Sequence, residues 1–317
     1  MLSTFMKNNG ILYLLISYVI WGFTPLLLKL VSIGFPAGYL VATRYLLGSA
    51  VLLIMIFVLG MAGRLRDISR RQWGQLVVLG LIGSGVTDLL WIASIRSIGA
   101  VLASFLVRLE VPLGVLMASL YLRERITRLL IVAASLSLMG LAFIAFPSAD
   151  FHSSSSQHLF VGVSAAVAVA LLWAFAGVYA KRLLSASMPP LLMTWVRLTV
   201  GGLFGLAAAW ATVGEPVNAY LRLGPADWLM LVLMGVFSSA VALYLYYLGL
   251  ELVKASVSSL LLALSLFIST SGGVFLGERL TMLQWLGVAS IVASLVITMY
   301  VGSERPAFVP TASIKVK

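Results

Sequence analysis

The chain has 317 residues, of which 62% are hydrophobic and 10% are charged, and its net charge is +11. A soluble domain has roughly 25% charged residues, so this composition indicates a protein whose surface is solvated by lipid. The absence of cysteines excludes disulfides, thiolate catalysis and cysteine-ligated zinc. The positive charge does not indicate nucleic acid binding, because the basic residues lie mostly in short segments between apolar runs.

A series of apolar segments runs along the chain, each long enough to cross a hydrocarbon core of about 30 Å as a helix. The predicted membrane helices are residues 11–32, 37–61, 73–95, 98–122, 127–146, 159–180, 189–213, 228–250, 254–277 and 280–302. We interpret the first as a retained helix rather than a signal peptide, because no small-residue cleavage site follows it closely. The sequence therefore predicts an all-α membrane protein with ten transmembrane helices.

The first five predicted helices and the last five resemble each other at a nearly constant offset, which indicates an internal repeat. The matching residues are Trp21 and Trp173, Arg44 and Arg197, Gly48 and Gly201, Ser84 and Ser239, and Glu124 and Glu278. Because each unit has an odd number of helices, the second enters the membrane from the opposite side, which suits alternating access. We predict a first repeat over 1–146, a linker over 147–158, an inverted second repeat over 159–302 and a tail over 303–317.

The positions of Lys and Arg predict the orientation of these helices. With the N-terminus placed in the cytoplasm, most of the basic residues in the loops and at the helix ends lie on the cytoplasmic side. The exceptions are Lys29, Arg96, Arg222 and Arg279. We therefore expect a multi-pass protein of the bacterial inner membrane with both termini in the cytoplasm.

Five charged residues lie well inside the predicted spans, away from their ends: Arg44, Asp88, Arg108, Glu110 and Arg197. Charges at membrane depth are costly, so these are candidates for a solute site. We expect Asp88 to pair with Arg108 across the hairpin between the third and fourth spans. Glu110 lies about 200° around the helix from Arg108 and needs Arg44, a cavity, a proton or a cation as its partner. The repeat-related Arg44 and Arg197 are expected to bind free carbonyls or a substrate carboxylate.

Aromatic residues supply a second set of candidates. Trp21 and Trp173 lie deep in their spans, away from the interfacial belts where Trp is common. Trp91, Tyr244, Tyr246 and Tyr247 cluster in the third and eighth spans, and ordinary packing is the alternative interpretation for each aromatic residue. The aromatic residues that we select for a cavity lining are Trp21, Trp91, Trp173, Tyr244 and Tyr247.

Two prolines are candidates for hinges. Pro25 and Pro112 lie within the first and fourth spans, where each leaves a carbonyl four residues earlier without its donor. Those carbonyls belong to Trp21 and Arg108, so the expected kinks lie beside candidate cavity residues. A membrane tolerates such breaks where they face protein or a water-filled cavity, and a kink that serves packing alone is the alternative.

Other residues are expected to be structural. Glu124 precedes the fifth helix, where the helix dipole favours a carboxylate. The pairs Gly201 and Gly205, and Gly273 and Gly277, have the spacing for close helix contact.

Several of these motifs together resemble a known family. Trp21-Gly22 near the start, the small and hydroxyl residues that open the fourth and ninth spans, and Leu-Gly-Glu-Arg-Leu-Thr at 276–281 are similar to the EamA type of the drug/metabolite transporter superfamily. One departure is Arg123, which replaces the usual glycine before Glu124. The resemblance covers roughly 11–302 and implies ten helices around a cavity lined by spans 1–4 and 6–9. It also implies transport, often outward, of amino acids, other metabolites or drugs.

The sequence therefore predicts a secondary transporter, with export as the expected direction, of small organic solutes such as amino acids. Three arginines and two acids within the spans suit a solute with a carboxylate. The alternatives are a proton-coupled exporter of lipophilic cations that uses Glu110 and Asp88, and a membrane scaffold or receptor without transport. The expected partners are the solute, the lipid bilayer and protons as a coupling ion, with no nucleic acid.

An enzyme is not expected. The two histidines, His152 and His158, lie in the linker, and the sequence has no HExxH motif, no P-loop and no acidic cluster with metal-ligand spacing. We therefore expect no cofactor and no metal.

Overall fold

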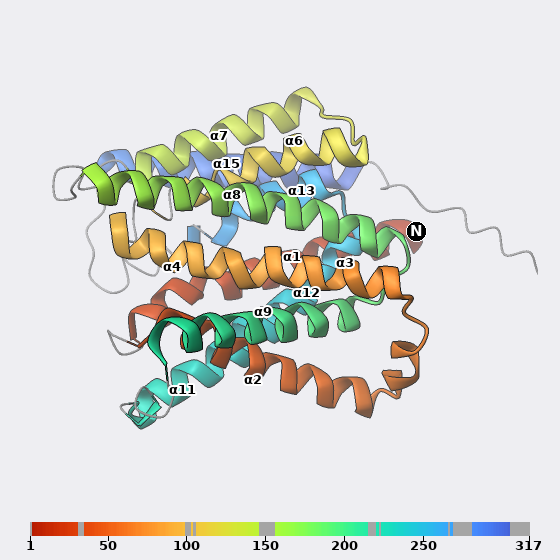
Figure 1. Ribbon diagram of the computed structural model, residues 1–317. Coiled ribbons are helices and arrows are strands. Elements are labelled where there is room, and N and C mark those ends of the chain that lie inside the picture. Colours follow the sequence, from red (N-terminus) through yellow and green to blue (C-terminus); the bar gives the residue numbers. More distant parts are fainter. Residues whose placement is uncertain are drawn as a thin grey trace, which may run out of the picture.

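The chain folds into a bundle of helices whose axes run roughly along one common direction (Figure 1). The computed structural model describes residues 2–30, 35–98, 103, 106–145, 156–214, 220–221, 223–265, 267–268 and 281–304. The helices of the first half are α1 (Leu2–Leu30), α2 (Ala37–Val58), η1 (Met61–Leu65), α3 (Arg70–Gly80), η2 (Leu81–Gly85), α4 (Val86–Ile98), α6 (Glu110–Leu122) and α7 (Arg128–Ala145). Those of the second half are α8 (Ser156–Ser185), α9 (Pro190–Val213), α11 (Pro225–Leu233), η4 (Met234–Val241), α12 (Ala242–Leu252), α13 (Ala255–Leu261) and α15 (Met282–Glu304).

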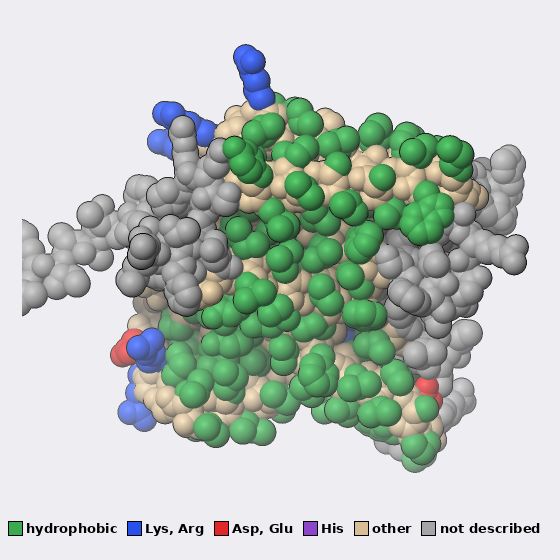
Figure 2. Space-filling model, turned by 180° about the vertical axis from the view of Figure 1, so that it is seen from behind, with side chains coloured by type: hydrophobic (Ala, Val, Ile, Leu, Met, Phe, Trp, Pro, Cys, Tyr) green, Lys and Arg blue, Asp and Glu red, His purple; other side chains and the backbone are tan. Residues whose placement is uncertain are grey.

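The described part of the chain contains six helices that are long and apolar enough to cross a membrane. They are Ala37–Val58, Arg70–Ile98, His158–Ser185, Pro190–Val213, Pro225–Leu252 and Met282–Val301. Four other predicted spans coincide with the shorter apolar helices Asn9–Thr24, Glu110–Leu122, Arg128–Ile144 and Ala255–Ser265. Hydrophobic side chains cover the broad face that Figure 2 shows, and Lys and Arg side chains gather towards one end of it. These features are those of a multi-pass integral membrane protein.

Helices from the two halves of the chain are interleaved. The most extensive helix contacts are those of α2 with α9, α7 with α15, α1 with α12, and α4 with α8. One hydrophobic core is formed mainly by α2, α3, α8, α9 and α12. A second is formed mainly by α1, α6, α7, α13 and α15. Each core therefore draws its helices from both halves.

The predicted close contact at Gly201 and Gly205 is present between α9 and its neighbours. A Cβ atom added to Gly201 would lie 2.7 Å from the Cβ atom of Ser84, and one added to Gly205 would lie 3.0 Å from a methyl group of Val41. Neither position has room for a side chain, which lets α9 approach η2 and α2 closely. Gly273 and Gly277 lie outside the described residues.

The fourth predicted span is broken near its middle. Arg108 and Leu109 form a turn, and α6 begins at Glu110. Pro112 therefore stands in the first turn of α6, where a helix needs no N–H donor from it. Pro25 lies within α1, which runs as one helix from Leu2 to Leu30. The roles of these prolines as hinges stay predictions.

Two π-helical turns interrupt the long membrane helices. η2 lies between α3 and α4, and η4 lies between α11 and α12. Such turns are rare and often occur at functional sites, since they release backbone carbonyls from the regular hydrogen-bond ladder. By the sequence matches between the halves, Gly83 and Ser84 of η2 correspond to Ser238 and Ser239 of η4.

Glu124 binds a different helix from the one that the sequence predicts. Its carboxylate accepts hydrogen bonds from the backbone N–H groups of Ala255, at 2.9 Å, and Ser256, at 3.0 Å. It also accepts from the Ser256 hydroxyl at 2.6 Å. Glu124 thus caps the N-terminus of α13 rather than that of α7. The helix dipole favours a carboxylate at either place, and the sequence does not show which helix end is nearer in space.

We expect Glu124→Gln to lower the free energy of unfolding by about 1–3 kcal/mol, because an amide replaces a charged acceptor of three hydrogen bonds. Thermal unfolding in detergent measures the effect. Asp67→Asn is the matched control, since Asp67 is exposed between η1 and α3. Equal melting temperatures for the two variants would contradict a capping role.

Candidate functional site

A cavity lies between the two halves of the chain. It contains about 1220 Å³ of space without protein atoms, part of it open to solvent. The first half contributes residues of α1, α2, η2, α4 and the start of α6, and the second half contributes residues of α8, α9, η4, α12 and α13. Among the described residues, α7 and α15 contribute none. The cavity is therefore enclosed by the same helices for which the family resemblance implied a lining.

Most of the residues selected from the sequence line this cavity. They are Trp21, Arg44, Asp88, Trp91, Arg108, Glu110, Trp173 and Arg197. Tyr244 and Tyr247 do not line it. Tyr247 is fully buried and bonds to Arg197, whereas Tyr246, its neighbour in sequence, faces the cavity. Adjacent helical residues point about 100° apart, so a cluster of three tyrosines in sequence cannot indicate which one faces a cavity.

Asp88 pairs with Arg44, and not with Arg108 as predicted. Arg44 Nη2 donates to Asp88 Oδ2 and, at 2.9 Å, to the hydroxyl of Tyr45. The Tyr45 hydroxyl in turn donates to Asp88 Oδ2 at 2.7 Å. The prediction assumed an unbroken helix through Arg108, whereas the chain turns there. The same ion pair also contradicts the alternative that Glu110 pairs with Arg44.

Arg197 is held by hydrogen bonds from each of its three guanidinium nitrogens to protein groups. Its Nη2 donates to the carbonyl of Gly83 in η2, and its Nε donates to the Ser84 hydroxyl at 2.9 Å. Its Nη1 donates to the Tyr247 hydroxyl at 2.7 Å. Of the two roles considered for this arginine, the structure therefore shows carbonyl binding. Nothing in the sequence marked Gly83 as a free acceptor, because the π-helical turn is not visible in the pattern of apolar residues.

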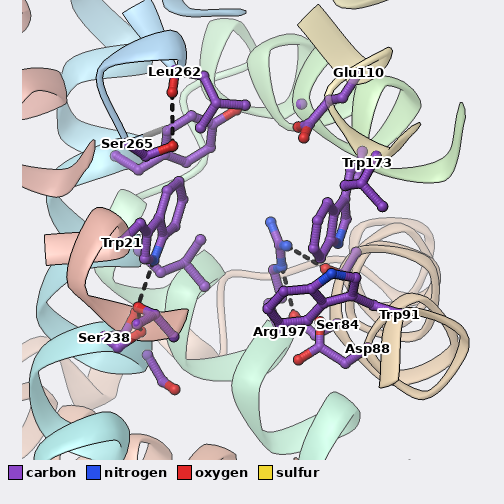
Figure 3. Close-up of a pocket in the computed structure, with 18 of the residues that line it drawn as sticks. Trp21, Ser84, Asp88, Trp91, Glu110, Trp173, Arg197, Ser238, Leu262 and Ser265 are labelled. Atoms are coloured by element: carbon purple, nitrogen blue, oxygen red, sulfur yellow. Dashed lines mark hydrogen bonds between the residues drawn. The ribbon is translucent and has the colours of Figure 1, made fainter. Parts of the chain in front are cut away.

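Arg108 and Glu110 are the charged lining residues for which the described part of the chain provides no hydrogen bond or ion pair. Arg108 Nε is buried without a hydrogen-bond partner among these residues. Figure 3 shows Glu110 on the same side of the cavity as Trp173, with Trp21 across from them. A carboxylate and a guanidinium at membrane depth that make no such contact are compensated by water or a ligand in the cavity.

Aromatic rings form two opposite walls of the cavity. Trp21 lies 5.8 Å from Tyr18 and 5.4 Å from Tyr246, measured between ring centroids. On the other wall Trp91 and Trp173 lie 5.8 Å apart. Trp21 also donates from its Nε1 to the carbonyl of Ser238, at 2.9 Å. Apolar rings with negative faces suit an organic solute, including one that carries a cationic group.

Sequence reasoning missed several lining residues. Tyr18 and Tyr246 belong to the aromatic wall, and Ser238, Ser239 and Ser259 supply hydroxyl groups. Tyr18 stands one turn before Trp21 on α1, and this spacing was the available signal. The serines carried no signal, because hydroxyl residues are common in membrane helices and bond to their own backbone. Among the described residues no group of three metal-binding side chains is present.

An apolar exterior and a central cavity with charged and aromatic lining define a class, the multi-pass membrane transporters. The model of the EamA-like transporter family matches residues 8–146 and 160–300, and the chain belongs to this family. This match confirms the resemblance found in the sequence motifs. The family and the names of its relatives indicate a transporter rather than an enzyme.

Two relatives at low identity are themselves transporters. The UDP-galactose/UDP-N-acetylglucosamine transporter srf-3 of Caenorhabditis elegans is 26% identical over 199 residues, which is 60% of this chain and 52% of that protein. The chain therefore matches only about half the length of srf-3. The uncharacterized transporter sll0355 of Synechocystis is 24% identical over 295 residues, 90% of this chain and 88% of that protein. A crystal structure with 17% identity has a TM-score of 0.78 and covers 94% of this chain and all of its own, which shows the fold alone.

Proposed function

We propose that this protein is a secondary transporter that exports small organic solutes, such as amino acids or related metabolites, by alternating access. The observation that supports this substrate class is a cavity with aromatic walls and two charges, Arg108 and Glu110, that make no hydrogen bond or ion pair with the described residues. A solute with a carboxylate, an amine and an apolar body would supply a partner for each charge and for the rings. Arg44 and Arg197 are already bound by protein groups, so Arg108 is the better candidate for a substrate carboxylate.

Alternating access rests on a second part of the proposal, ten membrane helices in two inverted repeats over 1–146 and 159–302. Two features support it. The contact of α1 with α12 has its counterpart in that of α8 with α4, and the contact of α6 with α8 has its counterpart in that of α13 with α1. In addition, α1 begins at the end of the bundle at which its counterpart α8 ends (Figure 1).

The orientation in the membrane follows from the basic end of the bundle. The exposed arginines after α2 and after α6 lie at the end of the bundle where the N-terminus lies. By the positive-inside rule we place this end in the cytoplasm, in a bacterial inner membrane.

Export of lipophilic cations in exchange for protons is the second candidate. Glu110 and the rings of Trp21, Trp91 and Trp173 favour it, because a carboxylate beside aromatic faces binds cations. Arg108 in the same cavity disfavours it. A nucleotide sugar, the substrate named for srf-3, carries two phosphates, and the cavity offers only one unpartnered cation among its described residues.

Ligand-dependent stability and counterflow test the proposal. We expect zwitterionic amino acids with apolar side chains to raise the melting temperature of the purified protein in detergent, since a ligand of the folded state stabilises it. The same solutes should exchange across liposomes that contain the protein. If only lipophilic cations stabilise it and drive counterflow, the second candidate replaces the first. If no solute crosses, a scaffold or receptor role replaces both.

A further inference from the structure

The two π-helical turns are held in different ways, although they occupy corresponding places in the two halves. Arg197 binds η2 through the Gly83 carbonyl and the Ser84 hydroxyl. In η4 the corresponding carbonyl, of Ser238, accepts from Trp21 instead. The hydroxyl of Ser239 is buried and has no partner among the described residues. A buried hydroxyl without a partner is costly, so its position needs an explanation.

Arg44, the counterpart of Arg197, has its backbone packed against η4, the turn that contains Ser239. A Cβ atom added to Gly235 of η4 would lie 2.9 Å from the Arg44 carbonyl. One added to Gly80, the corresponding residue beside η2, would lie 3.3 Å from the Arg197 carbonyl. The backbone of Arg44 therefore sits against η4 much as that of Arg197 sits against η2. The Arg44 side chain starts from an equivalent position, but it turns to Asp88 on α4.

Asp88 is what makes the two halves differ here. Its counterpart in the second half is Leu243, which offers Arg197 no carboxylate. The Nε atom of Arg44 is also buried without a partner, whereas Nε of Arg197 donates to Ser84. Two buried groups, Arg44 Nε and Ser239 Oγ, thus lack the contact that their counterparts make with each other.

We propose that Arg44 has two binding places and exchanges them during the transport cycle. In the conformation described here Arg44 binds Asp88 and Tyr45, which joins α2 to α4 within the first half. In the second conformation Arg44 donates to Ser239 Oγ and the Ser238 carbonyl, which joins α2 to η4 across the halves and releases α4. Asp88 then faces the cavity without its arginine. Arg44, Asp88 and Ser239 act as positioning residues that set the ratio of the two conformations.

The exchange predicts opposite shifts for two substitutions. Asp88→Asn removes the charge that holds Arg44 and should shift the ratio about tenfold towards the second conformation. Ser239→Ala removes a partner that only the second conformation uses, and should shift the ratio several-fold, by roughly a factor of five, towards the first. Ser239→Thr keeps a hydroxyl and should restore the wild-type ratio. Ser290→Ala is the control, because Ser290 bonds to its own helix on α15.

Spin-label distances measure this ratio without any substrate. The chain has no cysteine, so pairs of introduced cysteines carry the only labels. One pair, at Val58 and Tyr121, stands at the last turns of α2 and α6, and the other, at Phe160 and Leu221, stands near the starts of α8 and α11. All four side chains are exposed, and the pairs lie at opposite ends of the bundle (Figure 1). Each pair should show two distances in the full-length protein in liposomes.

The proposal rests on alternating access, and the measurement separates the two. One fixed distance per pair in every variant would overturn alternating access itself. Two distances whose ratio ignores Ser239→Ala, or shifts in the same direction for Ser239→Ala and Asp88→Asn, would overturn the exchange of Arg44 alone. Opposite shifts, with Ser290→Ala unchanged, would support it.

Discussion

Glu110→Gln is expected to weaken the binding of amine-bearing solutes at least thirtyfold. The carboxylate makes no hydrogen bond or ion pair with a described residue, so a bound ammonium group could pair with it directly in the cavity. Loss of one member of a buried charge pair costs roughly 2–5 kcal/mol, which corresponds to about thirtyfold or more in affinity. Titration of the solute by thermal shift or by calorimetry in detergent gives the change directly.

The matched control is Glu251→Gln, since Glu251 is exposed at the end of α12 and does not line the cavity. Arg108→Gln separates the two substrate classes. This substitution should lower the affinity for an amino acid and raise the affinity for a lipophilic cation, because it removes the positive charge of Arg108 from the cavity. Unchanged affinity in Glu110→Gln for every solute that binds the wild type would exclude Glu110 from the site.

Arg197→Met is expected to lower the free energy of unfolding by about 3–5 kcal/mol. Arg197 makes three hydrogen bonds, to Gly83, Ser84 and Tyr247. Its removal leaves these acceptors without a donor inside the membrane, where each unsatisfied group is costly. The contacts also join α9 to η2 across the halves, so we expect a lower melting temperature in detergent and faster digestion by protease.

Arg197→Lys tests the geometry of the guanidinium. A lysine keeps the charge but cannot reach three acceptors as a planar fork, so it should recover only part of the loss. Arg182→Met is the control for removal of an arginine, because Arg182 is exposed at the end of α8. A melting temperature in Arg197→Met equal to that of the control would mean that these contacts contribute no stability.

The site residues that could be predicted from the sequence were the charged residues inside apolar segments. Charges inside apolar segments are rare, and this rarity was enough to place Arg44, Asp88, Arg108 and Glu110 at one cavity. The partners of these charges were not predictable. Asp88 was assigned to Arg108 because a regular hairpin would place them together, and the break before Glu110 changes that register.

The helix irregularities were likewise beyond prediction. The π-helical turns η2 and η4 depend on which carbonyls find partners on other helices, and those partners are distant in sequence. Gly83 is an acceptor because Arg197 reaches it from α9. Glu124 caps α13 for a similar reason, since Ala255 and Ser256 come close only in the folded bundle. Periodicity describes one helix at a time and carries no information about these contacts.

The interleaving of the two hydrophobic cores has a consequence for how such a protein comes into being. Each core needs helices from before and after the linker, so the first half leaves the ribosome with no complete core to bury. Helices of the first half, such as α2 and α7, have their main packing partners, α9 and α15, in the second half of the chain. The two halves are therefore not independent units of folding, because neither completes a hydrophobic core without helices of the other.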